Sequence, residues 1–135
     1  MNDASLLFIG AIRAGSGWRR WLRPRRAVVE IQLDGAIPAP GASAAVAGHL
    51  ACTLDGMILT VAGGTFHVDR GRGSIAFRDA TVPGWSFAGR LAADLGSIAG
   101  DLDAPMSPAV RLRGEIVLRR ESIESVESVG DGQGR

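Results

Sequence analysis

Four side chains near the middle of the chain belong to types that catalyse reactions or bind metals: His49, Cys52, His67 and Asp69. In the strand pattern described below, both histidines and Asp69 face outward, and His49 lies two strands from His67, too far apart to share a metal ion. Cys52 alternates inward between leucines with no base beside it, which is typical of a small buried hydrophobic residue. We therefore predict no catalytic acid/base residues, no metal site and no cofactor.

A segment rich in arginine and tryptophan near the N-terminus is the other chemically distinctive feature. A short helix over residues 18–22 would place Trp18, Trp21 and Leu22 on one side and arginines on the other. Such a helix can lie on a membrane surface or bind a polyanion, or it can cover one end of the folded domain. We favour the second interpretation, with Trp18 and Trp21 as a lid. The net charge of +1 predicts no steering towards nucleic acid.

The composition favours one domain built from strands. A chain of 135 residues with 46% hydrophobic content can form one core, and 19 glycines with 6 prolines favour a sheet with many tight turns. No stretch approaches the ~20 apolar residues of a membrane-spanning helix. The apolar run at 6–12 is short and is followed by arginines, unlike a secretory signal. With a single cysteine, these features predict a cytoplasmic protein.

Two-residue turn signals set the strand register in the first half of the chain. Asp55-Gly56 and Gly63-Gly64 are pairs that adopt tight hairpin turns. Turns at these positions place Leu50 opposite Val61 and keep the apolar residues of three strands on one face. A third turn at residues 71–72 extends that face by setting Phe66 opposite Phe77.

The second half of the chain continues the same alternation. After a wider loop at 79–84, Trp85 and Phe87 face inward, and a turn at Leu95-Gly96 follows. On the outer face this register aligns Arg90, Asp101 and Arg111 in a row across three strands. Inward glycines at positions 89, 100 and 114 supply the corners that strong sheet curvature needs.

These patterns predict an all-β fold, an eight-stranded antiparallel up-and-down barrel with a short N-terminal helix. The last strand closes on a first strand at Ala27–Leu33, which removes both free edges. The expected organisation is an N-terminal segment with the Arg/Trp helix over 1–26, the barrel over 27–120 and a disordered acidic tail over 121–135.

The loops predict a barrel with two unlike ends. The connections at 35–45, 63–64, 79–84 and 104–108 fall together, and they carry every proline between the strands. An apolar pocket is expected there, opening between Ile37, Val82, Trp85 and Met106, although an eight-stranded barrel can equally be filled by its own aromatic side chains. The expected substrate-binding residues are Leu33, Leu50, Val61, Phe66, Phe77, Trp85, Phe87, Leu102, Met106 and Val110.

Two stretches resemble a known class of small barrels. The run Gly63–Asp69 (GGTFHVD) and the run Ala76–Gly89 (AFRDATVPGWSFAG) are similar to the central hairpins of lipocalin-like or allene-oxide-cyclase-like barrel cyclases, which include spirotetronate Diels-Alderases. The resemblance implies an apolar cavity that folds a polyketide-like polyene for intramolecular [4+2] cyclisation under a lid. Such a reaction proceeds by positioning, without proton transfer. The chain departs from that class in having no Tyr.

Two alternatives of other classes stay open. The barrel can be a non-catalytic carrier of lipid or of another small apolar ligand, or it can be a structural interaction module. The outer face is rich in alanine and bland enough to bury against a second copy as a homodimer.

Overall fold

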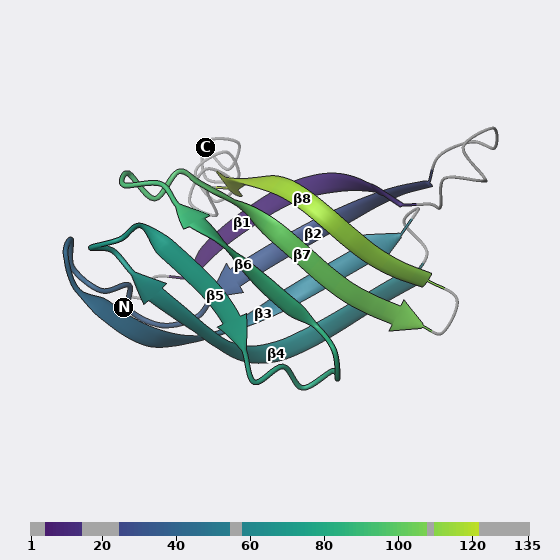
Figure 1. Cartoon of the computed structure of the whole chain (residues 1–135), viewed down its shortest axis with the longest axis horizontal. Coiled ribbons are helices and arrows are strands. Elements are labelled where there is room, and N and C mark those ends of the chain that lie inside the picture. The colour runs from purple at the N-terminus through teal and green to yellow at the C-terminus, as the bar shows by residue number, and fades with distance from the viewer. Residues whose placement is uncertain (1–4, 15–24, 55–57, 108–109, 122–135) are drawn as a thin grey trace, which may run out of the picture.

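Eight antiparallel strands close into a barrel in the computed structural model, which describes residues 5–14, 25–54, 58–107 and 110–121 (Figure 1). Each strand pairs with the next along the chain, and the last pairs with the first. The strands are β1 (Leu6–Ala14), β2 (Arg25–Leu33), β3 (Ser43–Leu54), β4 (Ile58–Asp69), β5 (Ser74–Arg78), β6 (Ser86–Leu91), β7 (Ser97–Ser107) and β8 (Val110–Glu121).

The predicted all-β, eight-stranded up-and-down barrel is confirmed. The described residues contain no helix, and none therefore that could cross a membrane. The expected Arg/Trp helix with Trp18 and Trp21, and the tail beyond Glu121, lie outside the described residues.

The eight strands differ from the eight that the sequence patterns predict. β1, which we had assigned to the N-terminal segment, lies between β2 and β8, so the last strand does not close directly on Ala27–Leu33. Two predicted strands on either side of Gly63-Gly64 are instead the single strand β4. The sequence patterns miss one strand, β1, and divide another, β4, into two, so the predicted number of strands is still eight.

Crowding explains one of the two glycines that the sequence presents as a turn, Gly64. A Cβ atom at Gly64 would lie 2.7 Å from Cε1 of Phe77, and one at Gly48, directly opposite Gly64, would lie 2.8 Å from Cδ1 of Phe66. The two glycines leave room for these aromatic rings where β3 and β4 bend across them. Their conformational freedom is not used for a turn.

The connection between β3 and β4 changes which residues of β4 face inward. Leu50 faces Ala62 rather than Val61, because three residues rather than two separate the strands. A shift of one residue turns every side chain to the opposite face. Ala62 is therefore buried, and Val61, an expected substrate-binding residue, is 47% exposed on the outside.

The remaining strands follow the predicted alternation more closely. Phe66 faces Phe77 as predicted, and the wider loop brings Phe87 opposite Phe77. The register of the last three strands differs by an even number of residues from the prediction, so inward residues stay inward. Arg90 consequently faces Ala99, and the predicted row of Arg90, Asp101 and Arg111 does not form.

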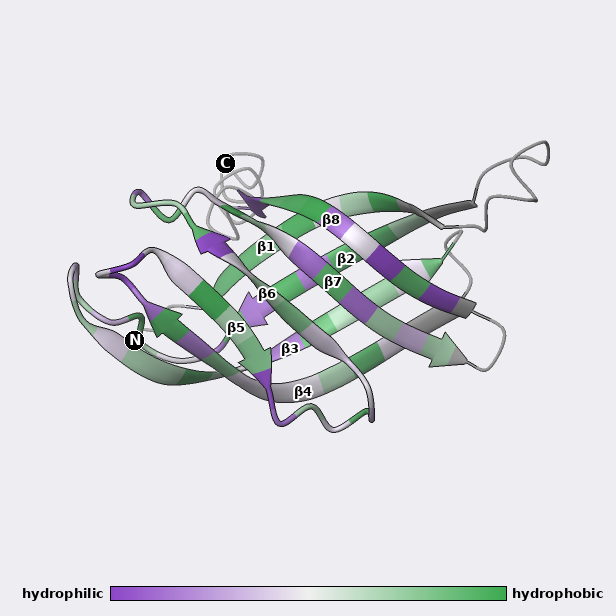
Figure 2. Cartoon of the chain, viewed as in Figure 1, coloured by the Kyte–Doolittle hydropathy of each residue, from purple (hydrophilic) through white to green (hydrophobic). Residues whose placement is uncertain are grey.

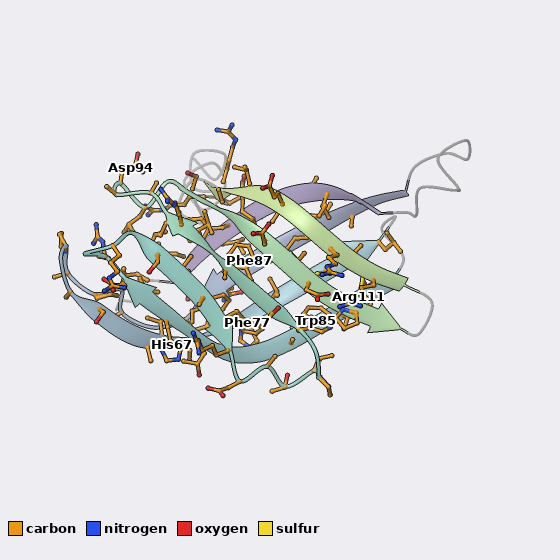
Figure 3. The ribbon with its side chains drawn as sticks, in the orientation of Figure 1. His67, Phe77, Trp85, Phe87, Asp94 and Arg111 are labelled. Carbon is orange, nitrogen blue, oxygen red and sulfur yellow. The ribbon has the colours of Figure 1, made fainter. Side chains whose placement is uncertain are left out.

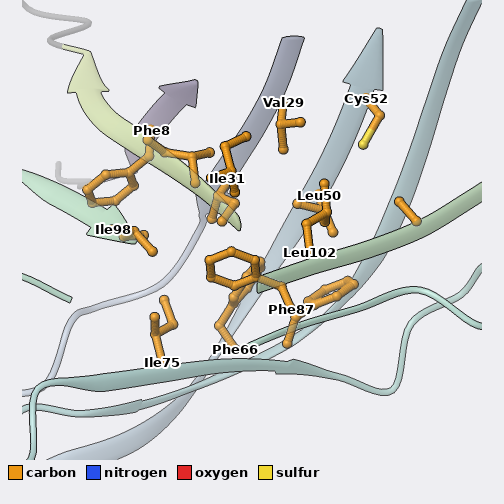
Figure 4. Packing of buried hydrophobic residues seen from close by; sticks show 14 of the residues in the cluster. Phe8, Val29, Ile31, Leu50, Cys52, Phe66, Ile75, Phe87, Ile98 and Leu102 are labelled. Atoms are coloured by element: carbon orange, nitrogen blue, oxygen red, sulfur yellow. The ribbon is translucent and has the colours of Figure 1, made fainter. Parts of the chain in front are cut away.

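The barrel interior is a hydrophobic core. Alternation of apolar and polar residues along the strands is visible in Figure 2, and Figure 4 shows Phe8, Ile31, Leu50, Phe66 and Phe87 converging on the centre. Every buried side chain among the described residues is hydrophobic, and no polar or charged side chain is buried there.

Two of the glycines predicted to face inward lie in close contact with the neighbouring strand. Gly89 and Gly100 face each other on β6 and β7, and a Cβ at either would lie 2.2–2.3 Å from a carbonyl oxygen of the neighbouring strand. Gly114 on β8 has a φ of +139°, which other residues rarely adopt.

Substitution of Gly100 by Ala should destabilise the barrel by about 1–3 kcal/mol, the range for overpacked sites. Gly63 provides a matched control in β4, because its Cβ would make only ordinary contacts of 3.7 Å or longer. Gly63→Ala should be neutral or stabilising by about 0.4–1 kcal/mol. Urea unfolding measures both, and equal effects would contradict the proposed contact between β6 and β7.

Candidate functional site

The two ends of the barrel carry different loops from those predicted. Among the connections that the structure describes, 79–85 lies at one end of the barrel, and 34–42, 70–73 and 92–96 lie at the other (Figure 1). We name these the Trp85 end and the Arg70 end. The prolines are divided between them, since Pro38 and Pro40 lie at the Arg70 end and Pro83 at the Trp85 end. The predicted grouping was wrong because it followed from the false turn at Gly63-Gly64.

The expected binding residues also lie in different parts of the barrel, and five of them are buried in its interior. Phe66, Phe77, Phe87, Leu50 and Leu102 are buried together in the interior, and the rings of Phe66 and Phe77 are 4.7 Å apart. Figure 3 shows Phe77 and Phe87 inside the barrel and His67 on its outside.

The four residues expected to surround the pocket opening, Ile37, Val82, Trp85 and Met106, do not lie together. Val82, Trp85 and Met106 lie at the Trp85 end and pack against the core, but Ile37 lies at the Arg70 end. Leu33 ends β2 and is also nearest the Arg70 end. The side chain of Val110 lies outside the described residues.

The short hairpin β5–β6 leaves a gap in the wall at the Trp85 end. β5 has five residues and β6 has six, whereas β4 has twelve and β7 has eleven. β4 pairs with β5 only from Thr65 onward, and β7 pairs with β6 only as far as Asp103. Residues 58–64 and 104–107 therefore continue past the hairpin on either side of it.

The segment 79–85, which we call the closing loop, bridges this gap. Two hydrogen bonds join Thr81 to β4: its backbone N–H donates to the Gly63 carbonyl at 2.8 Å, and its Oγ1 accepts from the Gly63 N–H at 2.9 Å. On the other side, Nε1 of Trp85 donates to the Pro105 carbonyl of β7 at 2.9 Å. Only 4% of Trp85 is exposed, so its ring seals the barrel wall.

The local sequence accounts for the shape of this loop. Pro83 and Gly84 occupy the central positions of a turn from Val82 to Trp85, and Gly84 has a φ of +84°. Proline followed by glycine is the preferred pair for a type II turn, whose third residue needs positive φ. The turn directs Trp85 back into the core and leaves Pro83 exposed.

Among the described residues, the interior offers hydrophobic contact, and its one titratable group, the thiol of Cys52, is not in a reactive state. Burial raises the pKa of the Cys52 thiol to about 12, so it stays protonated at neutral pH. A protonated thiol is a poor nucleophile.

Polar groups gather on the outside. Nδ1 of His49 lies 2.9 Å from Oδ2 of Asp34, and the other oxygen of Asp34 accepts a hydrogen bond from Gln32. His49 and His67 are on adjacent strands, not two strands apart as predicted, but four positions separate them along the ladder. No group of three metal-ligating residues occurs among the described residues. Asp69 instead accepts hydrogen bonds from the backbone N–H groups of residues 71 and 72.

The side chain of Arg70 connects the loops at the Arg70 end. The guanidinium of Arg70 donates to the carbonyls of Pro38 and Ala93, and so joins three loops. These hydrogen bonds are not predictable from the sequence, in which Arg70 is one of fifteen basic residues.

Two adjoining hollows lie on the outer wall, one of about 550 Å³ over β5–β8 and one of about 660 Å³ over β6–β8 and β1. Ala88 and Asp101 line both of them, and arginine and acidic side chains form their rims. Sequence reasoning missed them, although the short outward side chains of Ala76, Ala88 and Ala99 on neighbouring strands are the signal for a depression.

A bidentate ion pair between Arg111 and Asp103 borders the first of these hollows, which Asp103 lines. Arg111 donates from Nε and an Nη nitrogen to the two carboxylate oxygens of Asp103 at 2.8 and 2.7 Å. The hydrogen bond from Arg111 holds the pKa of Asp103 below its ordinary value.

No family model, curated protein or solved structure matches this chain. The functional interpretation therefore rests on the geometry of the barrel and on its residues.

The Asp103–Arg111 pair predicts a pH-dependent stability. Because the folded-state pKa of Asp103 lies below the unfolded one, the pair stabilises the fold at neutral pH, and this contribution is lost as the pH falls below about 4. Asp103→Asn should lower the melting temperature at pH 7, and this effect should shrink as the pH falls below about 4 and through the lowered pKa of Asp103. Asp101→Asn on the same strand is the control, and a difference between Asp103→Asn and wild type that does not shrink on acidification would contradict the assignment.

The buried thiol predicts slow modification. In mildly alkaline buffer, Cys52 should react with a thiol reagent only at the rate at which the barrel unfolds, because both burial and its raised pKa suppress the thiolate. Absorbance of the released chromophore measures this rate, with denatured protein as the control. Complete reaction within seconds in native buffer would show that the interior is open.

Proposed function

We propose that the protein binds an elongated apolar small molecule in its interior at the Trp85 end, and acts on it by holding its shape rather than by acid/base chemistry. The observation that carries this proposal is the closing loop, which seals an all-apolar interior with one tryptophan held by a single hydrogen bond to β7. Apolar walls match an apolar ligand, and the loop is the part of the wall that can move without breaking a strand ladder.

The energetics favour a long ligand over a short one. Moving Trp85 into water exposes about 150–250 Å², which costs roughly 4–6 kcal/mol at ~25 cal/mol per Å², and its hydrogen bond contributes about 1 kcal/mol more. A ligand must bury more apolar surface than it displaces. Polyenes and acyl chains with several hundred Å² of apolar surface meet this condition, and small aromatic solutes do not.

Cyclisation is the specific form of this activity that the barrel-cyclase resemblance suggests. A polyketide-like polyene folded against Phe66, Phe77 and Phe87 could have its diene and dienophile held together for a [4+2] reaction. Positioning alone can lower such a barrier by up to ~7–11 kcal/mol in favourable cases. Carriage of a lipid uses the same interior, with no chemical step.

Fluorescence of Trp85 tests binding. In a Trp18→Phe/Trp21→Phe background Trp85 is the single tryptophan, so its emission reports on the closing loop alone. Titration with a linear polyene tetronate or a fatty acid should give a saturable change in emission, because the ligand displaces Trp85 from its buried site. Thr81→Val removes the side-chain bond to Gly63 and should speed ligand association without removing the final change.

The product separates the two forms of the proposal. Conversion of the linear polyene to one stereoisomer faster than in buffer supports cyclisation, and saturable binding without conversion supports carriage. If neither ligand changes Trp85 emission, the interior is a packed core and the protein is an interaction module.

A further inference from the structure

The edge of β4 at the Trp85 end is exposed to pairing by another strand. Among the described residues, 58–64 of β4 pair with β3 on one side and with no strand on the other, where the bonds found are those between Gly63 and Thr81 of the closing loop. In an antiparallel ladder, alternate residues direct both backbone groups to the same side. Leu59 and Val61 share the parity of Gly63, so their N–H and C=O groups face this open side.

The two edges that border the gap are protected to different degrees. On β7, Pro105 has no N–H to donate, its carbonyl accepts from Trp85, and Asp103 places a charge nearby. Proline and charged residues are the usual means by which proteins prevent pairing at edge strands. Residues 58–62 (Ile-Leu-Thr-Val-Ala) contain neither, and Val61 is one of two large hydrophobic side chains exposed among the described residues.

We propose that this edge of β4 pairs antiparallel with the same edge of a second copy of the chain, forming a two-fold symmetric dimer. With Thr60 of each copy at the axis, Leu59 faces Val61 of the partner subunit, and the four backbone groups on each side form four hydrogen bonds between subunits. The outward Val61 side chains of both copies project from the same face of the joined sheet near the two-fold axis, so dimerisation covers part of their exposed surface.

A second copy fits this edge better than an unrelated extended peptide does. A peptide strand would cover β4 but carry its own free edge to the outside, whereas self-pairing covers both free edges at once and closes at the dimer. The contact is also small, about five residues from each copy, so it belongs with weak interfaces. The dimer is therefore expected at high protein concentration and is distinct from pairing through the outer face of β5–β8.

Sedimentation equilibrium of the full chain over a wide concentration range tests the dimer. Val61→Lys puts two like charges at the axis and should weaken association by about tenfold or more, without disturbing the core. Val117→Lys is the matched control, because Val117 is the other exposed valine, at 55%, and lies on β8 away from the edge. It should leave association unchanged.

Backbone hydrogen exchange gives a second, independent measurement. Exchange of the Val61 amide should slow as protein concentration rises, since its N–H becomes bonded only in the dimer. A monomer at every concentration, or association abolished by Val117→Lys and not by Val61→Lys, would overturn the proposal; the second result would place the contact on the outer face instead.

Discussion

The disparity in strand length is the constraint from which the rest of this structure follows. A hairpin of five and six residues, β5–β6, completes a barrel whose neighbouring strands have eleven and twelve. The wall cannot be closed by strand ladders alone, and the chain closes it with a loop and an aromatic ring. The hydrogen bond from Trp85 to Pro105 and the pair of bonds between Thr81 and Gly63 replace the missing ladder.

The aromatic cluster beneath the closing loop depends on two glycines, which place no side chain next to the rings. Phe66 and Phe77 can lie 4.7 Å apart only because Gly48 and Gly64 have no Cβ atoms in the space of the rings. Close packing of this kind makes interiors sensitive to added volume. In the proposed binding at the Trp85 end, a ligand therefore replaces side chains rather than filling a void, and it has to displace Trp85 and the closing loop.

Sequence reasoning found the fold because inward and outward residues alternate so regularly. From Phe66 to Ile116 most residues predicted to face inward, among them Phe87, Leu102 and Leu112, are buried even where the predicted partner is wrong, since register errors of two or four residues preserve the face. It failed at Val61, where a connection of three residues rather than two reversed the face. It missed β1 because residues 6–12 are almost uniformly apolar and lack the alternation that marks a strand buried on one side.

The candidate site was harder to predict than the fold, for a physical reason. Which loops share an end depends on the number of strands between them, so one false turn at Gly63-Gly64 moved Pro38 and Pro40 to the wrong end. The prediction that Phe77, Trp85 and Phe87 lie close together was not affected by that error, because these residues are close in sequence and joined by one hairpin. The Gly63-Gly64 pair was ambiguous, because glycine is favoured both in a tight turn and at a position where a Cβ would crowd its neighbours, as it would at Gly64.

The closing loop links the two proposals made for this protein. Thr81 is bonded to Gly63, two residues from Val61 on the same edge of β4. Any movement that releases Trp85 and breaks these bonds also frees Gly63 and lengthens the edge open to a second copy. A dimer that pairs with the longer edge favours the open loop, and linkage then requires an interior ligand to favour the dimer by the same factor. Interior binding and association through β4 are thus two consequences of one gap in the barrel wall.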